Sequence, residues 1–156
     1  MNIDIIVVGK TDSAEVQAIT DNYLRRLNFY TKTAFVAVPD LKNLKISADS
    51  RKRQEGELLM KQFGDGDYVV LLDERGAQRS SMDFAAWLQK RMNSGVKRLC
   101  FVIGGPYGFS KAVYDRADER ISLSPMTFSH QIVRAIFTEQ LYRAFTIINN
   151  EPYHHE

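Results

Sequence analysis

A regular alternation of short apolar runs with longer amphipathic stretches extends along the whole chain and limits the folds open to it. Runs rich in Val, Ile and Leu predict buried strands, and apolar residues spaced three and four apart predict helices that cover a sheet. Strands are predicted at residues 3–8, 34–38, 68–72, 99–103 and 120–123. Helices are predicted from Ser13 to Leu27 and at residues 51–63, 81–92, 110–117 and 129–148.

This order predicts an α/β fold with a mostly parallel sheet flanked by helices, because strand–helix–strand units join parallel strands through right-handed crossovers. No repeat, low-complexity tract or linker interrupts the pattern, so residues 1–156 are expected to form a single domain. A loop at residues 39–50 and a turn at residues 73–76 are expected to separate the regular elements.

The composition is that of a globular protein, and it leaves the partner open. The net charge is only +2, which neither demands nor excludes a nucleic acid. Basic residues do form clusters, the densest at Arg51-Lys52-Arg53, although any one cluster is more readily a solvated helix face. With one cysteine, no signal-peptide pattern and no apolar run of membrane-spanning length, we expect a cytoplasmic protein without a membrane partner.

Ligands of parallel α/β sheets bind beyond the carboxyl ends of the strands, which directs attention to the loops after Leu72, Ile103 and Leu123. The second loop, Gly104-Gly105-Pro106-Tyr107-Gly108, has neither the Rossmann glycine spacing nor the Gly-Lys-Ser/Thr of a P-loop. By itself it reads as a tight strand-to-helix turn. A nicotinamide-type oxidoreductase is therefore disfavoured.

The third loop, residues 123–128, is uncharged and mostly small or apolar. Such a segment offers backbone hydrogen-bonding groups beside apolar walls, which suits a flat heterocycle such as adenine. On composition alone an ordinary lead-in to a helix, with Thr127 or Ser129 as the cap, is the favoured interpretation.

Other catalytic chemistries find little support in the sequence. Cys100 lies in an apolar strand with no His or Lys beside it, so it is expected to be a core residue rather than a nucleophile. His130, His154 and His155 lack metal-ligand spacing, and we expect no metal. His154 follows Tyr153 in a polar tail, where exposure is expected.

Taken together, several motifs resemble one family from end to end. They are Ile5-Ile6-Val7-Val8-Gly9-Lys10, Tyr23-Leu24-Arg25-Arg26-Leu27, Val69-Val70-Leu71-Leu72-Asp73, Ile103 to Gly108, Leu123 to Phe128, Glu139 to Ala144, and Asn149 to His154. The chain resembles the RlmH family of SPOUT-class methyltransferases, which act on a pseudouridine of 23S ribosomal RNA. That family usually has Pro-His before the last helix, where this chain has Ser129-His130.

The resemblance implies a fold, a reaction and a site. It implies a trefoil knot in the C-terminal half, S-adenosylmethionine as the methyl donor, and methylation of N3 of a pseudouridine in 23S rRNA of the large subunit. It assigns cofactor binding to the residues at the strand ends, Leu72, Gly104, Gly105, Leu123, Ser124, Pro125, Met126, Thr127 and Phe128. Tyr153 and His154 are the candidates for shaping the RNA pocket, with His154 the weaker candidate for a general base.

Two points about assembly and class remain open at this level. SPOUT enzymes typically form homodimers, and the apolar arc of the last helix exceeds what one sheet face needs; Ile132, Val133, Ile136, Phe137, Leu141, Phe145 and Ile148 make up that arc. The alternative function is a non-catalytic ribosome-binding protein that uses the same scaffold only to dock on RNA.

Overall fold

Five parallel strands form one sheet in a computed structural model that describes residues 1–155. The strand order is β2-β1-β4-β3-β5, and every neighbouring pair is parallel. The strands are β1 (Asn2–Val8), β2 (Thr33–Val38), β3 (Tyr68–Gln78), β4 (Arg98–Ile103) and β5 (Glu119–Ser122). The predicted α/β fold is confirmed.

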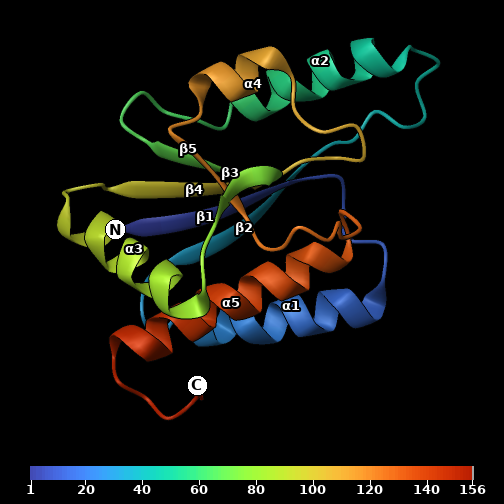
Figure 1. Cartoon of the computed structure of the whole chain (residues 1–156). Helices are drawn as coiled ribbons and strands as arrows, with labels where there is room; N and C mark the ends of the chain where they lie inside the picture. Colours follow the sequence, from blue (N-terminus) through green and yellow to red (C-terminus); the bar gives the residue numbers. More distant parts are fainter. Residues whose placement is uncertain (156) are drawn as a thin grey trace.

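Helices cover both faces of this sheet (Figure 1). The helices α1 (Ala14–Leu27), α3 (Ser81–Asn93) and α5 (Ile132–Ile148) lie on one face, and α2 (Ala48–Met60) and α4 (Lys111–Arg116) lie on the other. None of the helices in residues 1–155 is long and apolar enough to cross a membrane.

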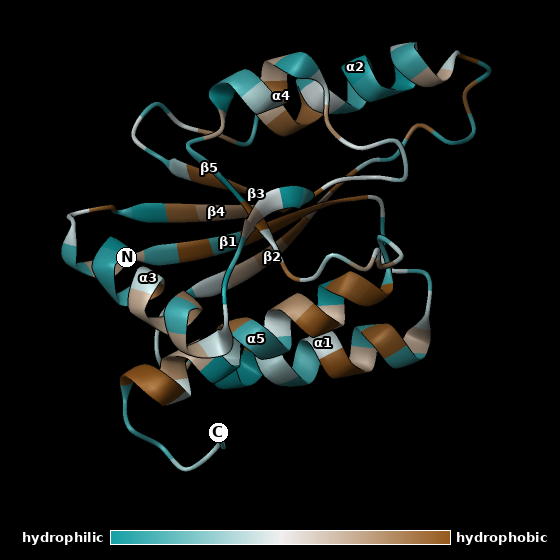
Figure 2. Ribbon diagram, in the orientation of Figure 1, coloured by the Kyte–Doolittle hydropathy of each residue, from teal (hydrophilic) through white to brown (hydrophobic). Residues whose placement is uncertain are grey.

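The core consists of two layers because side chains alternate between the faces of each strand. Along β1, Ile3, Ile5 and Val7 pack toward α1, α3 and α5, whereas Ile6 and Val8 pack toward α2 and α4. All five side chains are buried, and Figure 2 shows the apolar strands between more polar helices. A sheet buried on both faces explains why its strands read as continuous apolar runs.

Serine side chains cap the first turns of α1, α2, α3 and α4. Ser13 Oγ accepts a hydrogen bond from the Val16 backbone N–H at 3.3 Å, as predicted. Ser47 Oγ likewise accepts from the Ser50 N–H at 3.1 Å, so α2 begins at Ala48 inside the segment predicted as a loop. That loop is therefore shorter than predicted.

The predicted turn at residues 73–76 is wrong, because β3 continues through it to Gln78. The second half of β3 pairs with β5, after an irregularity in register between Leu72 and Ala77. At Gly76 the two strands approach so closely that a Cβ atom would lie 2.6 Å from the Ile121 backbone nitrogen. Only glycine fits this crossing, which Figure 1 shows between β3 and β5.

Two predicted apolar faces are narrower than expected. Helical spacing puts the apolar residues of α1 on one face that is expected to be buried, namely Val16, Ile19, Tyr23, Leu24 and Leu27. Ile19 is nevertheless 47% exposed. In α5, Phe137, Leu141 and Phe145 are buried in the core of this same chain, whereas Ile132 is 40% exposed. The apolar surplus of α5 is thus confined to its first turns. The trefoil knot stays a prediction.

Candidate functional site

Residues 72–75 within β3 and the loops that follow β4 and β5 meet at one edge of the sheet and enclose a cavity of 560 Å³. The lining residues from the three predicted loops are Leu72, Gly104, Gly105, Leu123, Ser124, Met126, Thr127 and Phe128. Pro125 is exposed and does not line the cavity. Eight of the nine residues proposed from sequence therefore surround one space.

The glycine-rich loop turns sharply beneath this cavity. Gly108 has a φ of +79° and donates its N–H to the Gly105 carbonyl oxygen at 3.1 Å. A Cβ atom on Gly105 would lie 3.2 Å from Glu55 Oε2 and 3.6 Å from Val8 Cγ1, two groups behind the loop. A side chain at 105 would therefore point toward Glu55 of α2 and Val8 of β1 and make a tight contact with Glu55.

The opposite wall, residues 123–128, keeps its shape through local hydrogen bonds. Ser122 Oγ donates to the Ser124 carbonyl oxygen at 2.9 Å, and the Met126 N–H donates to Ser124 Oγ at 2.9 Å. Met126 is 75% exposed and Phe128 is 41% exposed. This wall therefore presents backbone groups and apolar side chains to a ligand and carries no charge.

A charged network that the sequence reasoning missed forms the rim. Tyr114 Oη donates to Asp73 Oδ2 at 2.5 Å and accepts from Arg75 Nη2 at 3.1 Å. Burial alone would raise the pKa of Asp73, but the hydrogen bonds from Tyr114 and the Arg75 N–H, with the charges of Arg75 and Arg120, leave it below its usual value. Burial and the bond to Asp73 raise the pKa of Tyr114. The rim thus holds a stable carboxylate and a protonated phenol.

His130 is a second lining residue to which sequence reasoning gave no role. It lies two residues before the start of α5, and its backbone carbonyl oxygen accepts a hydrogen bond from Arg134 Nε at 3.0 Å. The sequence signals for it were its position two residues beyond the apolar loop and its place in the Ser129-His130 pair, where the resembled family usually has Pro-His.

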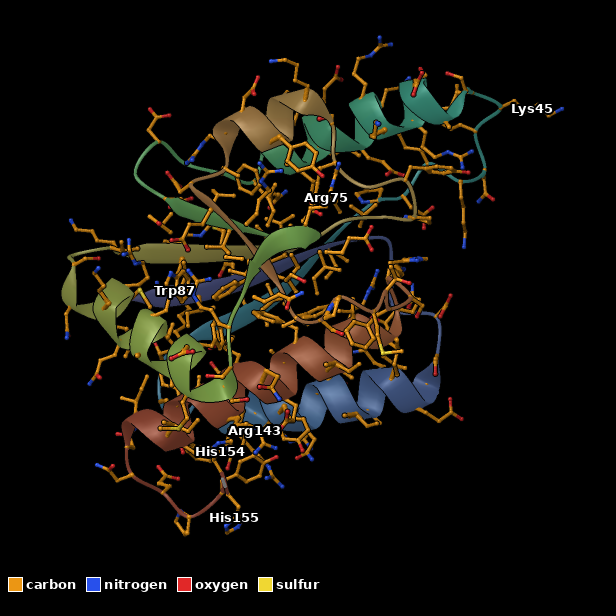
Figure 3. All side chains as sticks on the ribbon, viewed as in Figure 1. Lys45, Arg75, Trp87, Arg143, His154 and His155 are labelled. Carbon is orange, nitrogen blue, oxygen red and sulfur yellow. The ribbon has the colours of Figure 1, made fainter. Side chains whose placement is uncertain are left out.

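The tail residues lie elsewhere in this chain. Tyr153 Oη donates to Glu139 Oε1 at 3.0 Å, and the guanidinium of Arg143 lies 4.8 Å from the centre of the Tyr153 ring. His154 Nδ1 lies 3.1 Å from Arg143 Nη1. Figure 3 shows Arg143 and His154 together near the C-terminus and apart from Arg75 at the cavity rim. The structure does not bring Tyr153 or His154 to the cavity of their own chain.

Cys100 is a core residue, as predicted. Its side chain is fully buried, and burial raises the pKa of the thiol to about 12. Since the thiolate is the nucleophilic form, this cysteine is inert at neutral pH. Across residues 1–155, no three His, Cys, Asp or Glu side chains gather as metal ligands would.

Comparison with known proteins is consistent from end to end. The family described as "Predicted SPOUT methyltransferase" matches residues 1–154. A protein named ribosomal RNA large subunit methyltransferase H from Christiangramia forsetii is 57% identical over 156 residues, covering 99% of each chain. Proteins of the same name from Flavobacterium johnsoniae and Parabacteroides distasonis are each 54% identical over 157 residues, covering 100% of each chain.

Proposed function

This chain belongs to the SPOUT methyltransferase family, and from that premise we propose that it methylates ribosomal RNA of the large subunit. More narrowly, the proposed reaction transfers a methyl group from S-adenosylmethionine to N3 of a pseudouridine in 23S rRNA. The observation that carries this proposal is the cavity at the carboxyl edge of the sheet, formed by the loops that the family resemblance assigns to the methyl donor.

The cavity suits S-adenosylmethionine in size and chemistry. Its 560 Å³ falls among small-molecule sites of about 300–1,000 Å³. Leu72, Leu123 and Phe128 can contact the faces of an adenine, while backbone groups of residues 123–128 can bond its edge. The carboxylate of Asp73 at the rim favours a positively charged ligand.

When bound, S-adenosylmethionine supplies an electrophilic methyl carbon on a positively charged sulfur. The chain must then align the RNA nitrogen with that carbon, exclude water and provide for the proton of the imide N–H. Residues 104–105 and 123–128 form opposite walls of the cavity and can align the two reactants. The exposed apolar side chains of Met126 and Phe128 can exclude water from them. Direct transfer needs no covalent enzyme intermediate, which agrees with the inert thiol of Cys100.

We also propose a homodimer. Met126, Phe128 and Ile132 are exposed apolar side chains at the start of α5, beside the cavity, and a second copy of the chain would bury them. The tail with Tyr153 and His154 would then be free to serve the cavity of the partner rather than its own.

Calorimetric titration with S-adenosylmethionine tests the cofactor site. Thr127 is exposed and lines the cavity, so Thr127→Trp fills the space without disturbing the core, whereas Thr127→Ser is the matched control. We expect binding by the wild type and by Thr127→Ser, and none by Thr127→Trp. A wild type that binds rRNA but not S-adenosylmethionine would instead support the non-catalytic ribosome-binding protein.

A further inference from the structure

His130 occupies an unusual place among the ionisable groups of the cavity. Its backbone is held by Arg134, yet neither of its ring nitrogens has a hydrogen-bond partner within residues 1–155. The side chain is half-buried and lines the same space as the loops at 104–105 and 123–128. An imidazole fixed at its backbone and unpaired at its ring is available to a ligand in the cavity.

The surroundings of His130 favour the neutral form of its ring. Burial, followed by the positive charge of Arg134, lowers the pKa of His130 below its ordinary value of 6.5. Lys42 acts in the same direction, and the carboxylates of Asp12 and Asp40 oppose it. At pH 7 the ring is therefore unprotonated and able to accept a proton.

The other ionisable side chains of the cavity are poorer acceptors. Asp73 is occupied by the hydroxyl of Tyr114 and has a lowered pKa, and Tyr114 itself stays protonated. Glu74 is exposed to water at the rim of the cavity. Arg75 has no lone pair to offer, because its guanidinium remains protonated.

We propose, on the basis of the methyl transfer proposed above, that His130 is the catalytic residue that takes the proton from the RNA nitrogen. The N3–H bond breaks and its proton bonds to an imidazole nitrogen of His130. The lone pair of N3 forms the new N–CH₃ bond, and the electron pair of the broken S–CH₃ bond stays on sulfur. A cationic donor and a neutral imidazole thus become a neutral thioether and an imidazolium, which releases its proton to water.

His130 replaces His154 of the C-terminal tail as the candidate general base. His154 is paired with Arg143 in its own chain, whereas His130 is at the cavity whether or not a partner is present. The chain contains three histidines, so the roles can be separated by single substitutions.

The first experiment measures single-turnover methyl transfer to large-subunit rRNA against pH for the wild type, His130→Asn and Gln89→Asn. Gln89 is exposed on α3 and does not line the cavity, so it serves as the control. General-base catalysis contributes roughly 10²–10⁴-fold, so we expect His130→Asn to lose about 100-fold or more at pH 7. Its rate should then rise about tenfold per pH unit, since hydroxide must ionise the imide, whereas the wild-type rate should be level above pH 6.5. Gln89→Asn should match the wild type.

The second experiment does not depend on activity. NMR titration of the histidine rings, with His130 assigned by its loss in His130→Asn, should give a midpoint below 6.5 for His130, and adding S-adenosylhomocysteine should shift its signal but not that of His155. Calorimetry should show unchanged S-adenosylmethionine affinity in His130→Asn.

The possible results distinguish the role of His130 from the methyl transfer on which it rests. Wild-type rate and pH profile in His130→Asn, or loss of S-adenosylmethionine binding in that variant, would overturn the role of His130 and leave methyl transfer standing. A wild type that transfers no methyl group to rRNA would overturn both.

Discussion

Arg134 Nη2 donates a hydrogen bond to the carbonyl oxygen of Val8 at 2.8 Å and so joins the first turn of α5 to the end of β1. The side chain of Arg134 is fully buried, and its Nη1 donates to the Gly9 carbonyl oxygen at 2.8 Å. Nε completes the set at the His130 carbonyl oxygen. The guanidinium therefore holds the backbone carbonyl groups of Val8, Gly9 and His130 together and positions His130 beside the cavity.

Removing the hydrogen bonds of Arg134 should destabilise the folded protein. Arg134→Met keeps the volume but leaves the carbonyl groups of Val8, Gly9 and His130 without their charged donor, so we expect a loss of about 3 kcal/mol in the free energy of unfolding. Arg53→Met, at an exposed position of α2, should change it by less than about 0.5 kcal/mol. Urea unfolding measures the free energy of unfolding of both variants. Equal losses in the two would contradict a stabilising role for the hydrogen bonds of Arg134.

The crossing of β3 and β5 makes a second stability prediction. Gly76→Ala would press a methyl group against the backbone of Arg120 and Ile121, which cannot move aside as a side chain could. We expect a loss of about 3 kcal/mol or more in the free energy of unfolding. Gly66→Ala is the control because nothing lies within 4 Å of its Cβ position. A thermal scan in which both variants melt like the wild type would rule out the tight crossing.

The three basic residues of α2, Arg51, Lys52 and Arg53, do not share one role. Arg51 Nη2 donates to the Leu44 carbonyl oxygen at 3.3 Å, and its guanidinium lies 5.5 Å from the centre of the Tyr107 ring. Arg51 thus holds the 39–47 segment near the glycine-rich loop, and only Lys52 and Arg53 are left for RNA. If both contact phosphates, replacing them with Ala should reduce the log–log salt slope of RNA binding by about 1.4. An unchanged slope would mean a solvated helix face.

If the tail of one chain completes the cavity of its partner in the proposed homodimer, two inactive chains should complement each other. A Thr127→Trp subunit has a blocked cavity and an intact tail, and a subunit lacking residues 153–156 has the reverse. If tails act across the interface, the mixed dimer has one complete site and regains part of the methyl-transfer activity. If each tail serves its own chain, mixing restores nothing.

Much of the fold was predictable because its signals are local. The apolar strands and the start of α1 at the Ser13 cap lie where the sequence pattern put them. The continuation of β3 past Leu72 was not predictable, because it depends on pairing with β5, where Ala77 pairs with Ile121 and Gln78 with Ser122, far along the chain. A polar Asp-Glu-Arg-Gly segment looks like a turn until that partner strand is known.

The candidate site divides in the same way. Its backbone loops follow from strand ends in a parallel sheet, so Gly104 and the 123–128 segment were found from sequence and resemblance. The network of Asp73 and Tyr114 was missed because those residues come from β3 and α4 and meet only in the fold. His130 gave no metal-ligand or nucleophile pattern, and only its position against the cavity suggests a role.

The most direct test of the account is transfer of labelled methyl from S-adenosylmethionine to ribosomal particles that lack the modification, followed by mapping of the labelled base. The account predicts label in the 23S rRNA, on N3 of a pseudouridine, with wild-type protein and none with Thr127→Trp. Label on a different base or atom would contradict the proposed specificity. No label with protein that binds the particles would contradict the proposed reaction itself.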